Sequence, residues 1–422
     1  MSLLVFGVDH ASADLDILER CAVPADDTLK ALQSLVELEH VLEAVVLSTC
    51  NRLEVYAHLT RFHDGLDEIK HWMADHAGVS EEALEGPAYA WWDGRAAEHL
   101  FAVTAGLESM VVGEQQIATQ VRDAMELARA EGAARGVLLR MFEQALKASR
   151  RVRRETEIGR GASSIVDVGL EVAARHLDGG WAAGRTALIV GAGEIGALTA
   201  DRLAADGIGH LLVWNRSPDK AERIARRAEG DVVFDLDTGL AAADLVVCTT
   251  GASHPVVGAA DVARAVADRD GGEPVVLLDL AVPRNIDPAC AALERVVLID
   301  MRAVRDTVGR TVGADVISSA RELVAEEARA FEAWTRAIEV EPTIRSLREA
   351  ADDVRRAELD RLAGRFGDLD DRQREALEAL SKGIVNTLLH GPTVKLRELA
   401  EHGGAEHHAN ALRELFELDD DD

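Results

Sequence analysis

The stretch TALIVGAGEIG, residues 186–196, decides the fold of the central part of the chain. Its apolar start predicts a buried strand, and the run ALTADRLAADG that follows predicts a helix. Between them, Gly191, Gly193 and Gly196 have the GxGxxG spacing that permits a tight turn, a close backbone approach to a pyrophosphate, and close helix packing. We therefore expect a dinucleotide cofactor to contact Gly191, Ala192, Gly193, Glu194, Ile195 and Gly196.

The sequence around this motif continues the same architecture. Apolar runs in LLVWNRS, DVVFD, ADLVVCTTGA and PVVLLDLAVP predict further strands, and helical stretches such as DKAERIARRAEG separate them. Strands that alternate with helices form a parallel, doubly wound sheet. We expect a Rossmann-type parallel-sheet domain over residues 160–303.

The end of the next strand, VWNRS, predicts which nicotinamide cofactor binds. An NAD site usually has Asp or Glu there, whereas this chain has Asn215, Arg216 and Ser217. Arg216 can pair with a 2'-phosphate, which favours NADPH; the alternative is a solvated arginine on a loop. After another apolar strand come Thr249, Thr250 and Gly251. In this interpretation they line the nicotinamide side of the cofactor crevice; the alternative is a plain strand-to-helix turn.

The remainder of the 422 residues suits two further domains. Residues 1–155 mix strand-like and helical runs and predict an N-terminal α/β domain. Residues 304–422 read as a long connecting helix and a helical bundle. The apolar stripes of this segment predict a homodimer, with a closed three-helix bundle as the alternative. Their members are Leu323, Phe331, Trp334 and Ile338 before Pro342, and Leu377, Leu380, Ile384 and Leu388 after it.

Composition limits the class of protein. The formal charge is −29, from 75 acidic and 46 basic residues spread along the chain, which suggests a halophilic source. The alternative is an acidic protein from a genome that favours arginine codons. Long uncharged apolar stretches and a signal-like start are absent, so we expect a cytoplasmic protein without a membrane segment. Four widely spaced cysteines indicate neither a disulfide framework nor a metal site.

One of these cysteines stands in LSTCNRLEVY, residues 47–56, between two strand-like runs. Cys50 is therefore expected at a strand end or tight turn, with polar neighbours and Arg52 two places later. A nearby guanidinium lowers a thiol pKa and makes the cysteine a candidate nucleophile; a buried structural thiol is the alternative. In an NADPH enzyme, a thiolate can convert an activated acyl group to a thioester that hydride reduces to an aldehyde.

Several blocks resemble one family, the glutamyl-tRNA reductases, in the family's order. They are STCNRLEVY at 48–56, the block from His99 to Ala124, GAGEIG, NRS, DLAVPRNID at 279–287 and KGIVNTLLHGPTVKLRE at 382–398. The resemblance implies a catalytic N-terminal domain, an NADPH domain and a helical dimerisation domain. It also implies that Cys50 attacks the ester of glutamyl-tRNA(Glu), and that NADPH reduces the thioester to glutamate-1-semialdehyde at the start of tetrapyrrole synthesis.

The resemblance assigns further residues. His99 matches a residue associated with activity, by deprotonating the thiol or protonating the leaving ribose oxygen; a core histidine on the apolar face of its helix is the alternative. The family also supplies its product to glutamate-1-semialdehyde aminotransferase, a possible partner. The glutamyl-site residues carried over are Thr49, Asn51, Arg52, Ser109, Glu114, Gln115, Gln116 and Gln120.

Two other functions fit parts of the sequence. A shikimate-dehydrogenase-like oxidoreductase would explain residues 160–300 but leaves Cys50 and the C-terminal helices without a role. A non-catalytic NADPH sensor would explain the helices as a dimerisation element. For tRNA, one helical face offers a basic stripe that binds phosphates or makes ordinary ion pairs, and it consists of Arg140, Lys147, Arg151 and Arg154.

Overall fold

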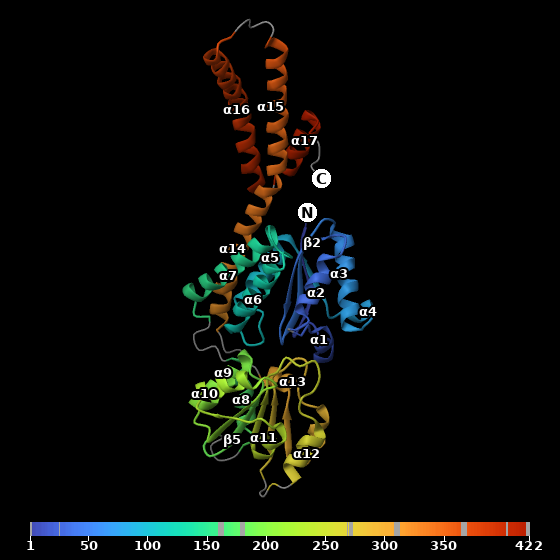
Figure 1. The fold of residues 1–422 in the computed structure, drawn as a ribbon, viewed down its shortest axis with the longest axis vertical. Coiled ribbons are helices and arrows are strands. Elements are labelled where there is room, and N and C mark those ends of the chain that lie inside the picture. Colours follow the sequence, from blue (N-terminus) through green and yellow to red (C-terminus); the bar gives the residue numbers. More distant parts are fainter. Residues whose placement is uncertain are drawn as a thin grey trace. The chain divides into compact units, whose positions relative to one another are not determined.

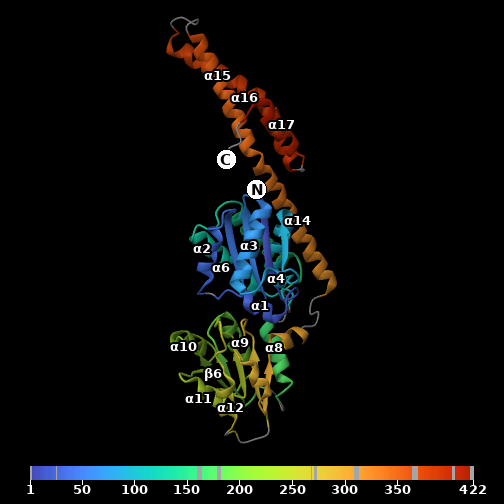
Figure 2. The ribbon, with the colours of Figure 1, turned by 90° about the vertical axis from the view of Figure 1, so that its right-hand side faces the viewer.

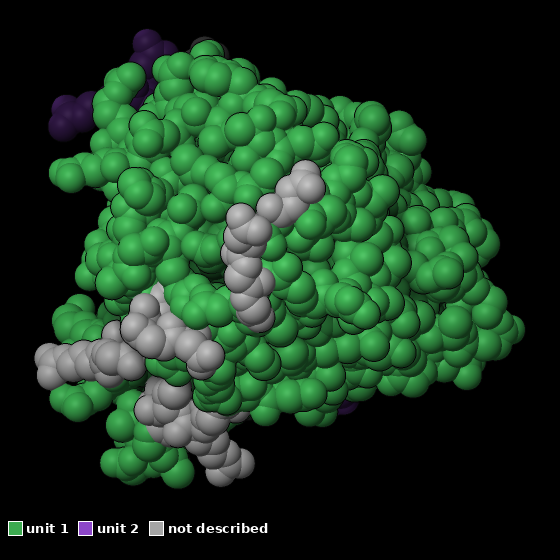
Figure 3. All heavy atoms as spheres, turned by 90° about the horizontal axis from the view of Figure 1, so that it is seen from below, with its two compact units in different colours: residues 1–325 green, residues 326–422 purple. Residues whose placement is uncertain are grey.

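The computed structural model describes residues 2–24, 26–158, 164–177, 182–267, 269, 273–307, 313–363, 369–401 and 404–418. The chain divides into two compact units, residues 1–325 and 326–422, which Figure 3 colours separately. The division falls within helix α14 (Ala314–Glu339).

An antiparallel sheet forms the centre of the N-terminal domain, with the strand order β2-β3-β1-β4. Helices α1 and α3 pack on the sheet, and α5 and α7 pack together and on its other side (Figure 1). The elements are β1 (Ser2–Asp9), α1 (Leu15–Cys21), α2 (Thr28–Val36), β2 (Val41–Ser48), β3 (Arg52–Leu59), α3 (Phe62–Ala77), α4 (Glu81–Leu84), β4 (Tyr89–Trp92), α5 (Asp93–Thr104), α6 (Gln116–Ala130) and α7 (Val137–Glu155). The expected α/β domain is present, and β4 is a strand that the sequence patterns did not reveal.

Strand β3 is unusual because every one of its residues is buried, including charged ones. It lies between β2 and β1, so neither of its edges is free. Arg52, Glu54 and His58 alternate along it and are 2%, 0% and 8% exposed. Charged side chains are rarely buried so completely without partners, so this face of β3 must carry a paired polar network.

The central domain has the expected parallel sheet of six strands, in the order β10-β9-β8-β5-β6-β7. Successive side chains of β5 point to opposite faces of the sheet and pack in two hydrophobic cores. Ala187 and Ile189 lie in one core, and Leu188 and Val190 lie in the other. Both faces of the sheet are thus covered, as in a Rossmann fold. The elements are α8 (Ile165–Ala174), β5 (Thr186–Val190), α9 (Glu194–Ala205), β6 (His210–Trp214), α10 (Pro218–Arg227), β7 (Asp231–Val232), α11 (Leu236–Ala242), β8 (Leu245–Cys248), α12 (Ala259–Ala267), β9 (Val275–Asp279), the 3-10 helix η1 (Pro288–Ala292), β10 (Val296–Ile299) and α13 (Met301–Thr307).

The expected limits of the central domain, residues 160 and 303, can be compared with the observed elements. A boundary after residue 303 falls inside α13, whose Met301 and Val304 belong to the central core. The expected start at residue 160 lies outside the described residues. The three-domain division itself stays a prediction.

The second unit is helical. Helices α15 (Glu341–Ala363) and α16 (Asp371–Glu401) lie side by side, and α17 (Glu406–Phe416) packs against α15 (Figures 1 and 2). A small core forms where they meet, and it contains Val340, Ile344, Leu396, Ala400, Ala405 and Ala409. Farther along α16 an apolar stripe is open to solvent, with Leu380, Ile384 and Leu388 62%, 53% and 69% exposed. Among the described helices, none combines the length and the apolar character needed to cross a membrane.

Candidate active site

Cys50 occupies the tight turn between β2 and β3, as expected. The backbone N–H of Thr49 donates to the Arg52 carbonyl at 2.9 Å, and the Asn51 N–H donates to Thr49 Oγ1 at 3.1 Å. The thiol residue is partly exposed and lines a small cavity of about 10 Å³ with Met110 from the N-terminal domain and Met301 from α13. Cys50 therefore faces the central domain.

The resting Cys50 thiol does not have the lowered pKa that a nearby guanidinium could give it. Burial raises the pKa of Cys50 to about 12, and the charge of Glu114 adds to this effect. Arg52 lowers the pKa, as expected from the sequence, but it does not compensate for the burial. The resting thiol is thus protonated, and its proton must leave once substrate is bound.

Glu54, two residues after Arg52, is the centre of a buried hydrogen-bond network. The Tyr56 hydroxyl donates to Glu54 Oε2 at 2.7 Å, whereas Arg52 Nη1 and the Tyr89 hydroxyl donate to Glu54 Oε1 at 2.7 and 2.5 Å. His99 Nε2 lies 2.7 Å from the same oxygen. The network joins strands β3 and β4 to helix α5, so it fixes the catalytic candidate His99 relative to the Cys50 turn.

The electrostatics of Glu54 follow from this network. Burial opposes ionisation, but Arg52 and His99 hold the pKa of Glu54 well below its ordinary range. The pKa of Tyr56 and of Tyr89 is raised, by burial and by the Glu54 charge. Glu54 was not among the functional residues expected from the sequence. The alternation of Arg52, Glu54 and His58 with apolar residues along β3 was the signal that could have identified it.

Arg52, expected in the glutamyl site, is committed to partners inside the protein. Its side chain is 1% exposed, and besides Glu54 it donates from Nη2 to the Glu108 carbonyl. Both terminal nitrogens therefore already have acceptors inside the protein. The guanidinium ties the Cys50 turn to the segment that follows α5.

That segment, residues 105–116, brings the other glutamyl-site candidates toward Cys50. Ser109 is 7% exposed. Burial raises the pKa of Glu114, and the hydrogen bond with Ser109 offsets part of that rise. Gln116 and Gln120 are one turn apart at the start of α6 and partly buried, whereas Gln115 is exposed. Two buried polar atoms here have no partner among the described residues, Asn51 Oδ1 and Gln116 Nε2. One is an acceptor and one a donor, the pair that an amino group and a carboxylate would satisfy.

The same segment also joins the two domains of the first unit. Arg153 on α7 donates to the carbonyls of Gly113 and Glu114, at 3.4 and 3.1 Å. Val111 is fully buried within the core of the central domain. The charge of Glu194, in the glycine-rich loop, raises the pKa of Glu114 further. The glutamyl-site candidates and the cofactor loop are therefore neighbours.

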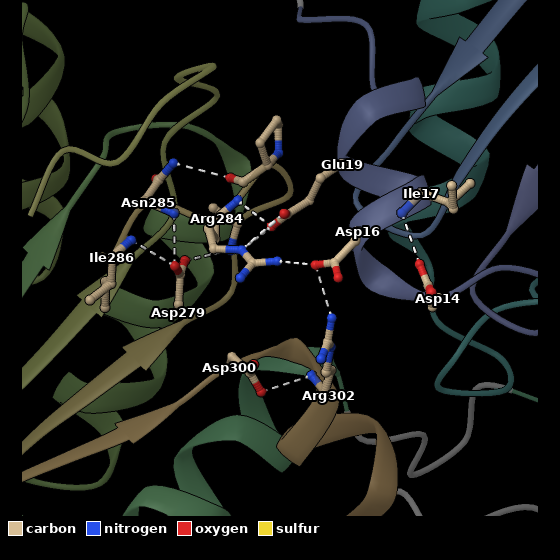
Figure 4. Close-up of polar contacts among 12 residues, drawn as sticks. Asp14, Asp16, Ile17, Glu19, Asp279, Arg284, Asn285, Ile286, Asp300 and Arg302 are labelled. Atoms are coloured by element: carbon tan, nitrogen blue, oxygen red, sulfur yellow. Dashed lines mark hydrogen bonds and ion pairs between the residues drawn. The ribbon is translucent and has the colours of Figure 1, made fainter. Parts of the chain in front are cut away.

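A second contact between the domains is ionic (Figure 4). Arg284, in the loop after β9, donates from Nε to Glu19 at 2.7 Å and from Nη2 to Asp16 at 2.7 Å, both on α1. Arg302 on α13 donates to the same Asp16 oxygen at 3.0 Å. We call the group of Asp16, Glu19, Arg284 and Arg302 the ionic clasp.

The loop that carries Arg284 is held from below by Asp279, which accepts hydrogen bonds from three backbone N–H groups. Burial nevertheless raises the pKa of Asp279 to about 7.

The glycine-rich loop has the geometry that the sequence predicted. Gly191 has a φ of +123°, and a Cβ there would lie 2.7 Å from Thr249 Oγ1. A Cβ on Gly196 would lie 2.5 Å from the Gly191 carbonyl oxygen. A Cβ on Gly193, by contrast, would meet no atom within 4 Å. The loop thus leaves free space at the N-terminus of α9, where a pyrophosphate binds in this fold.

The remaining cofactor candidates surround this loop. Asn215 Nδ2 donates to the Ser217 carbonyl at 3.0 Å, which shapes the turn after β6. Arg216 is 90% exposed, with its nearest acidic partner, Asp26, at 4.0 Å. Thr250 donates its hydroxyl to Asn285 at 2.6 Å, and Gly251 is exposed. Ala192 and Ile195 pack on the core, so their side chains are structural.

Three family models match the chain. Residues 6–156 match the N-terminal domain of glutamyl-tRNAGlu reductase, residues 171–306 match shikimate / quinate 5-dehydrogenase, and residues 319–418 match the dimerisation domain of glutamyl-tRNAGlu reductase. The central domain accordingly belongs with those that bind a nicotinamide cofactor.

Solved structures give a full-length match. The glutamyl-tRNA reductase from Methanopyrus kandleri is 30% identical over 99% of both chains, with a TM-score of 0.52. Partial matches include the nucleotide-binding domain of glutamyl-tRNA reductase from Thermoplasma volcanium, 20% identical over 40% of this chain and 99% of that one, with a TM-score of 0.25. A transhydrogenase from Sinorhizobium meliloti is 17% identical over 40% of this chain and 52% of that one, with a TM-score of 0.29. The full-length match, with the family models at both ends, shows that this enzyme belongs to the glutamyl-tRNA reductase family.

Proposed function

We propose that this chain reduces the glutamyl ester of tRNA(Glu) to glutamate-1-semialdehyde with NADPH, through a thioester on Cys50. Family membership assigns the chain to the first step of tetrapyrrole synthesis. The observation that carries the mechanism is the partly exposed Cys50 next to Asn51, whose buried Oδ1 has no partner among the described residues, together with the equally unpaired Nε2 of Gln116, two residues after the Glu114 whose charge acts on Cys50. Those two atoms suit the amino and carboxylate groups of a glutamyl residue.

In the first step, Cys50 Sγ bonds to the glutamyl carbonyl carbon while the bond from that carbon to the ribose oxygen breaks. The thiol loses its proton and the ribose oxygen gains one. Thr49, Ser109, Glu114 and Gln120 belong to the proposed glutamyl site with Asn51 and Gln116. Arg52 supports the site mainly through Glu54 and Glu108, because its terminal nitrogens already donate to them.

His99 is the proposed acid for the leaving ribose oxygen. Two roles were open, and the cavities favour this one: His99 lines a different pocket from the one that Cys50 lines. Its hydrogen bond to Glu54 supports an orientation in which the second ring nitrogen is available to substrate. A core histidine without function is less consistent with a ring that lines a pocket.

When bound, NADPH would supply a hydride to the thioester carbon; the bond from that carbon to Cys50 Sγ then breaks, the aldehyde is released, and the sulfur takes up a proton to return to the thiol. The residues proposed to hold it are the 191–196 loop, Asn215, Arg216, Ser217, Thr250 and Gly251. The open space at Gly193 fits a pyrophosphate, and the exposed Arg216 guanidinium fits a 2'-phosphate. The contacts of Val111 and Arg284 between the domains support hydride transfer within a single chain.

Incubating the protein with radiolabelled glutamyl-tRNA and NADPH, and trapping an aldehyde, tests this function. Label in a trapped semialdehyde supports it; release of free glutamate alone contradicts it. Oxidation of shikimate by the purified protein would favour the shikimate-dehydrogenase alternative. NADPH binding without any reaction on glutamyl-tRNA would favour the sensor.

Assembly and environment complete the proposal. The exposed stripe on α16, and the match of this region to a dimerisation domain, support a homodimer held by the second unit. Transfer of the product to the aminotransferase is a further proposal, as is a cytoplasmic location.

The charge of −29 supports a halophilic source, which full activity without added KCl would contradict. The α7 face with Arg140, Lys147, Arg151 and Arg154 is the proposed phosphate contact for tRNA, although Glu155 pairs with Arg151 and Arg154.

A further inference from the structure

The loop that follows β9, residues 280–286, contacts two segments on which the proposed reaction depends. We call it the β9 loop. Asn285 binds the segment after β8, and the preceding residue, Arg284, binds helix α1 (Figure 4). Asp279 accepts hydrogen bonds from the backbone at both ends of the loop, which keeps the loop in one conformation. A shift of α1 would therefore move the segment after β8 as well.

Asn285 fixes the position of Thr250, one of the residues proposed to line the nicotinamide side of the cofactor site. Asn285 is fully buried, and its Oδ1 accepts from the Thr250 backbone N–H at 2.8 Å and from the Thr250 hydroxyl at 2.6 Å. Its carbonyl oxygen accepts from the N–H groups of Val256 and Val257 at 2.7 and 3.0 Å. The β9 loop thus determines where the segment from Thr250 to Val257 lies.

Arg284 holds the same loop to Glu19 on α1. Its backbone N–H donates to Glu19 Oε1 at 2.9 Å, and its Nε donates to the two carboxylate oxygens at 2.7 and 2.9 Å. The side chains are 26% and 16% exposed, so this pair is better shielded from water than an ordinary surface ion pair. Several charge-assisted hydrogen bonds between two groups fix their relative orientation as well as their distance. Asp16 receives one bond from this guanidinium and is 65% exposed, so Glu19 is the main anchor.

Helix α1 is also a wall of the Cys50 cavity. Leu15 and Leu18 line that cavity together with Cys50. Leu15 further belongs to the hydrophobic cluster of the central domain that includes Met301. Apolar burial holds the two domains together but is not directional. The hydrogen bonds between Arg284 and Glu19 supply the direction that this packing lacks.

We propose that Arg284 is a positioning residue for hydride transfer, which acts through Glu19 to align the Thr250 segment with Cys50. This rests on the proposed function, which places the acyl group on Cys50 and the nicotinamide beside Thr250. Arg284 itself touches neither reacting group. A displacement of about 1 Å between reacting groups can slow a reaction about a hundredfold, so a loss of alignment should be visible in the rate.

The two chemical steps can be measured separately on the full-length protein. Glutamyl transfer to Cys50 is followed by mass without NADPH, and reduction is then followed by trapped aldehyde in a single turnover at saturating NADPH. Arg284→Ala should change glutamyl transfer and NADPH affinity by less than about twofold and slow reduction by at least about tenfold. Asp16→Asn, which removes the exposed partner of the same guanidinium, is the matched control and should keep the rate of reduction.

A merely structural role of Arg284 would affect both steps or weaken NADPH binding. Equal slowing of both steps, or an unchanged rate of reduction, would therefore overturn the proposal. If Arg284→Ala does not fold, Glu19→Gln provides the same test, because it removes the charge and keeps the shape of the side chain.

A double-mutant cycle tests whether Arg284 acts through Glu19. Glu19→Ala and Arg284→Ala should slow reduction to a similar extent, and the double variant should be no slower than either single variant. A double variant in which the two effects multiply would show that Arg284 acts by another route, and would contradict the proposal.

A measurement without turnover separates this proposal from the proposed function. Cys50 is partly exposed, whereas Cys21, Cys248 and Cys290 are buried, so iodoacetamide should modify Cys50 first. Loss of the Arg284 contact should open the cavity and speed alkylation of Cys50 by at least about threefold, as for other local openings. An unchanged rate would overturn the proposed alignment. If the wild type accepts no glutamyl group, the proposed function fails, and faster alkylation in Arg284→Ala still supports the alignment.

Discussion

The first unit holds two regions of opposite construction, the Glu54 network and the glycine-rich cofactor loop. In the network, a fully buried carboxylate receives four side-chain partners from β3, β4 and α5. In the loop, the backbone provides the site: Gly193 faces open space, and Arg216 is 90% exposed. The network is therefore complete before substrate arrives, whereas the loop acquires its main partners from the ligand.

This difference predicts which measurements each region will affect. Removing a member of the Glu54 network leaves a buried charge unpaired, so the folded state should lose stability. Removing a side chain near the loop should leave the fold intact and weaken the cofactor alone. Stability and affinity thus separate the two regions experimentally.

The largest expected effect is on the nucleophile, which lies beside the network. Cys50→Ser should lower aldehyde formation from glutamyl-tRNA by at least about a thousandfold, because a hydroxyl cannot form the thioester. Steady-state assays with trapped aldehyde would measure this. Cys248→Ser is the control, since that thiol is fully buried within the central sheet. Substantial activity in Cys50→Ser would mean that another group is the nucleophile.

The network itself should respond in stability. Glu54→Gln leaves the Arg52 guanidinium buried without its countercharge and should lower the free energy of unfolding by about 3–5 kcal/mol in urea titrations. Tyr56→Phe removes one hydrogen bond to the same carboxylate and should cost about 1 kcal/mol. A Glu54→Gln protein as stable as the wild type would show that the network does not stabilise the fold.

The same carboxylate predicts a pH dependence. Because the folded state lowers the pKa of Glu54, its stabilising effect is present above the ordinary carboxyl range and is lost as the pH falls below that range. The difference in unfolding free energy between wild type and Glu54→Gln should therefore shrink in acid. A difference that is constant from neutral pH down to acid unfolding would contradict the assignment.

At the loop, the expected effect is on ligand choice. Arg216→Ala should weaken the binding of NADPH by about 1.5–3 kcal/mol and the binding of NADH much less, because only NADPH carries the 2'-phosphate. Fluorescence titration with each cofactor would measure both constants, and the melting temperature should not change because Arg216 is solvated. Equal losses for the two cofactors would exclude Arg216 as the phosphate contact.

The smallest effect is expected at the ionic clasp, between the two regions. Asp16 is 65% exposed and its pKa is lowered by the hydrogen bond from Arg284, so Asp16→Asn should cost only about 0–1 kcal/mol. Added salt should shrink that difference further, as for any solvated ion pair. A cost that grows with KCl would indicate that the clasp is more than a surface pair.

The sequence predicted the backbone-built region better than the side-chain network. The positions of Gly191, Gly193 and Gly196 follow from local spacing, because a glycine loop is defined by its own neighbours. The turn at Cys50 was also local and was correctly predicted. The partners of Glu54 come from three elements up to 45 residues apart, and no local pattern specifies them. The raised pKa of Cys50 was missed for the same reason, since burial depends on how the segment with Met110 and Val111 packs.

The most direct test of the central claim is the mass of the protein after incubation with glutamyl-tRNA in the absence of NADPH, using the Gly193→Asp variant. A Cβ added at Gly193 meets no protein atom within 4 Å, so the fold should be kept while the aspartate carboxylate blocks the pyrophosphate. The account predicts one glutamyl group on Cys50 that hydroxylamine removes, and no aldehyde when NADPH is then added. An unmodified protein, or a glutamyl group on Cys21, Cys248 or Cys290, would contradict it.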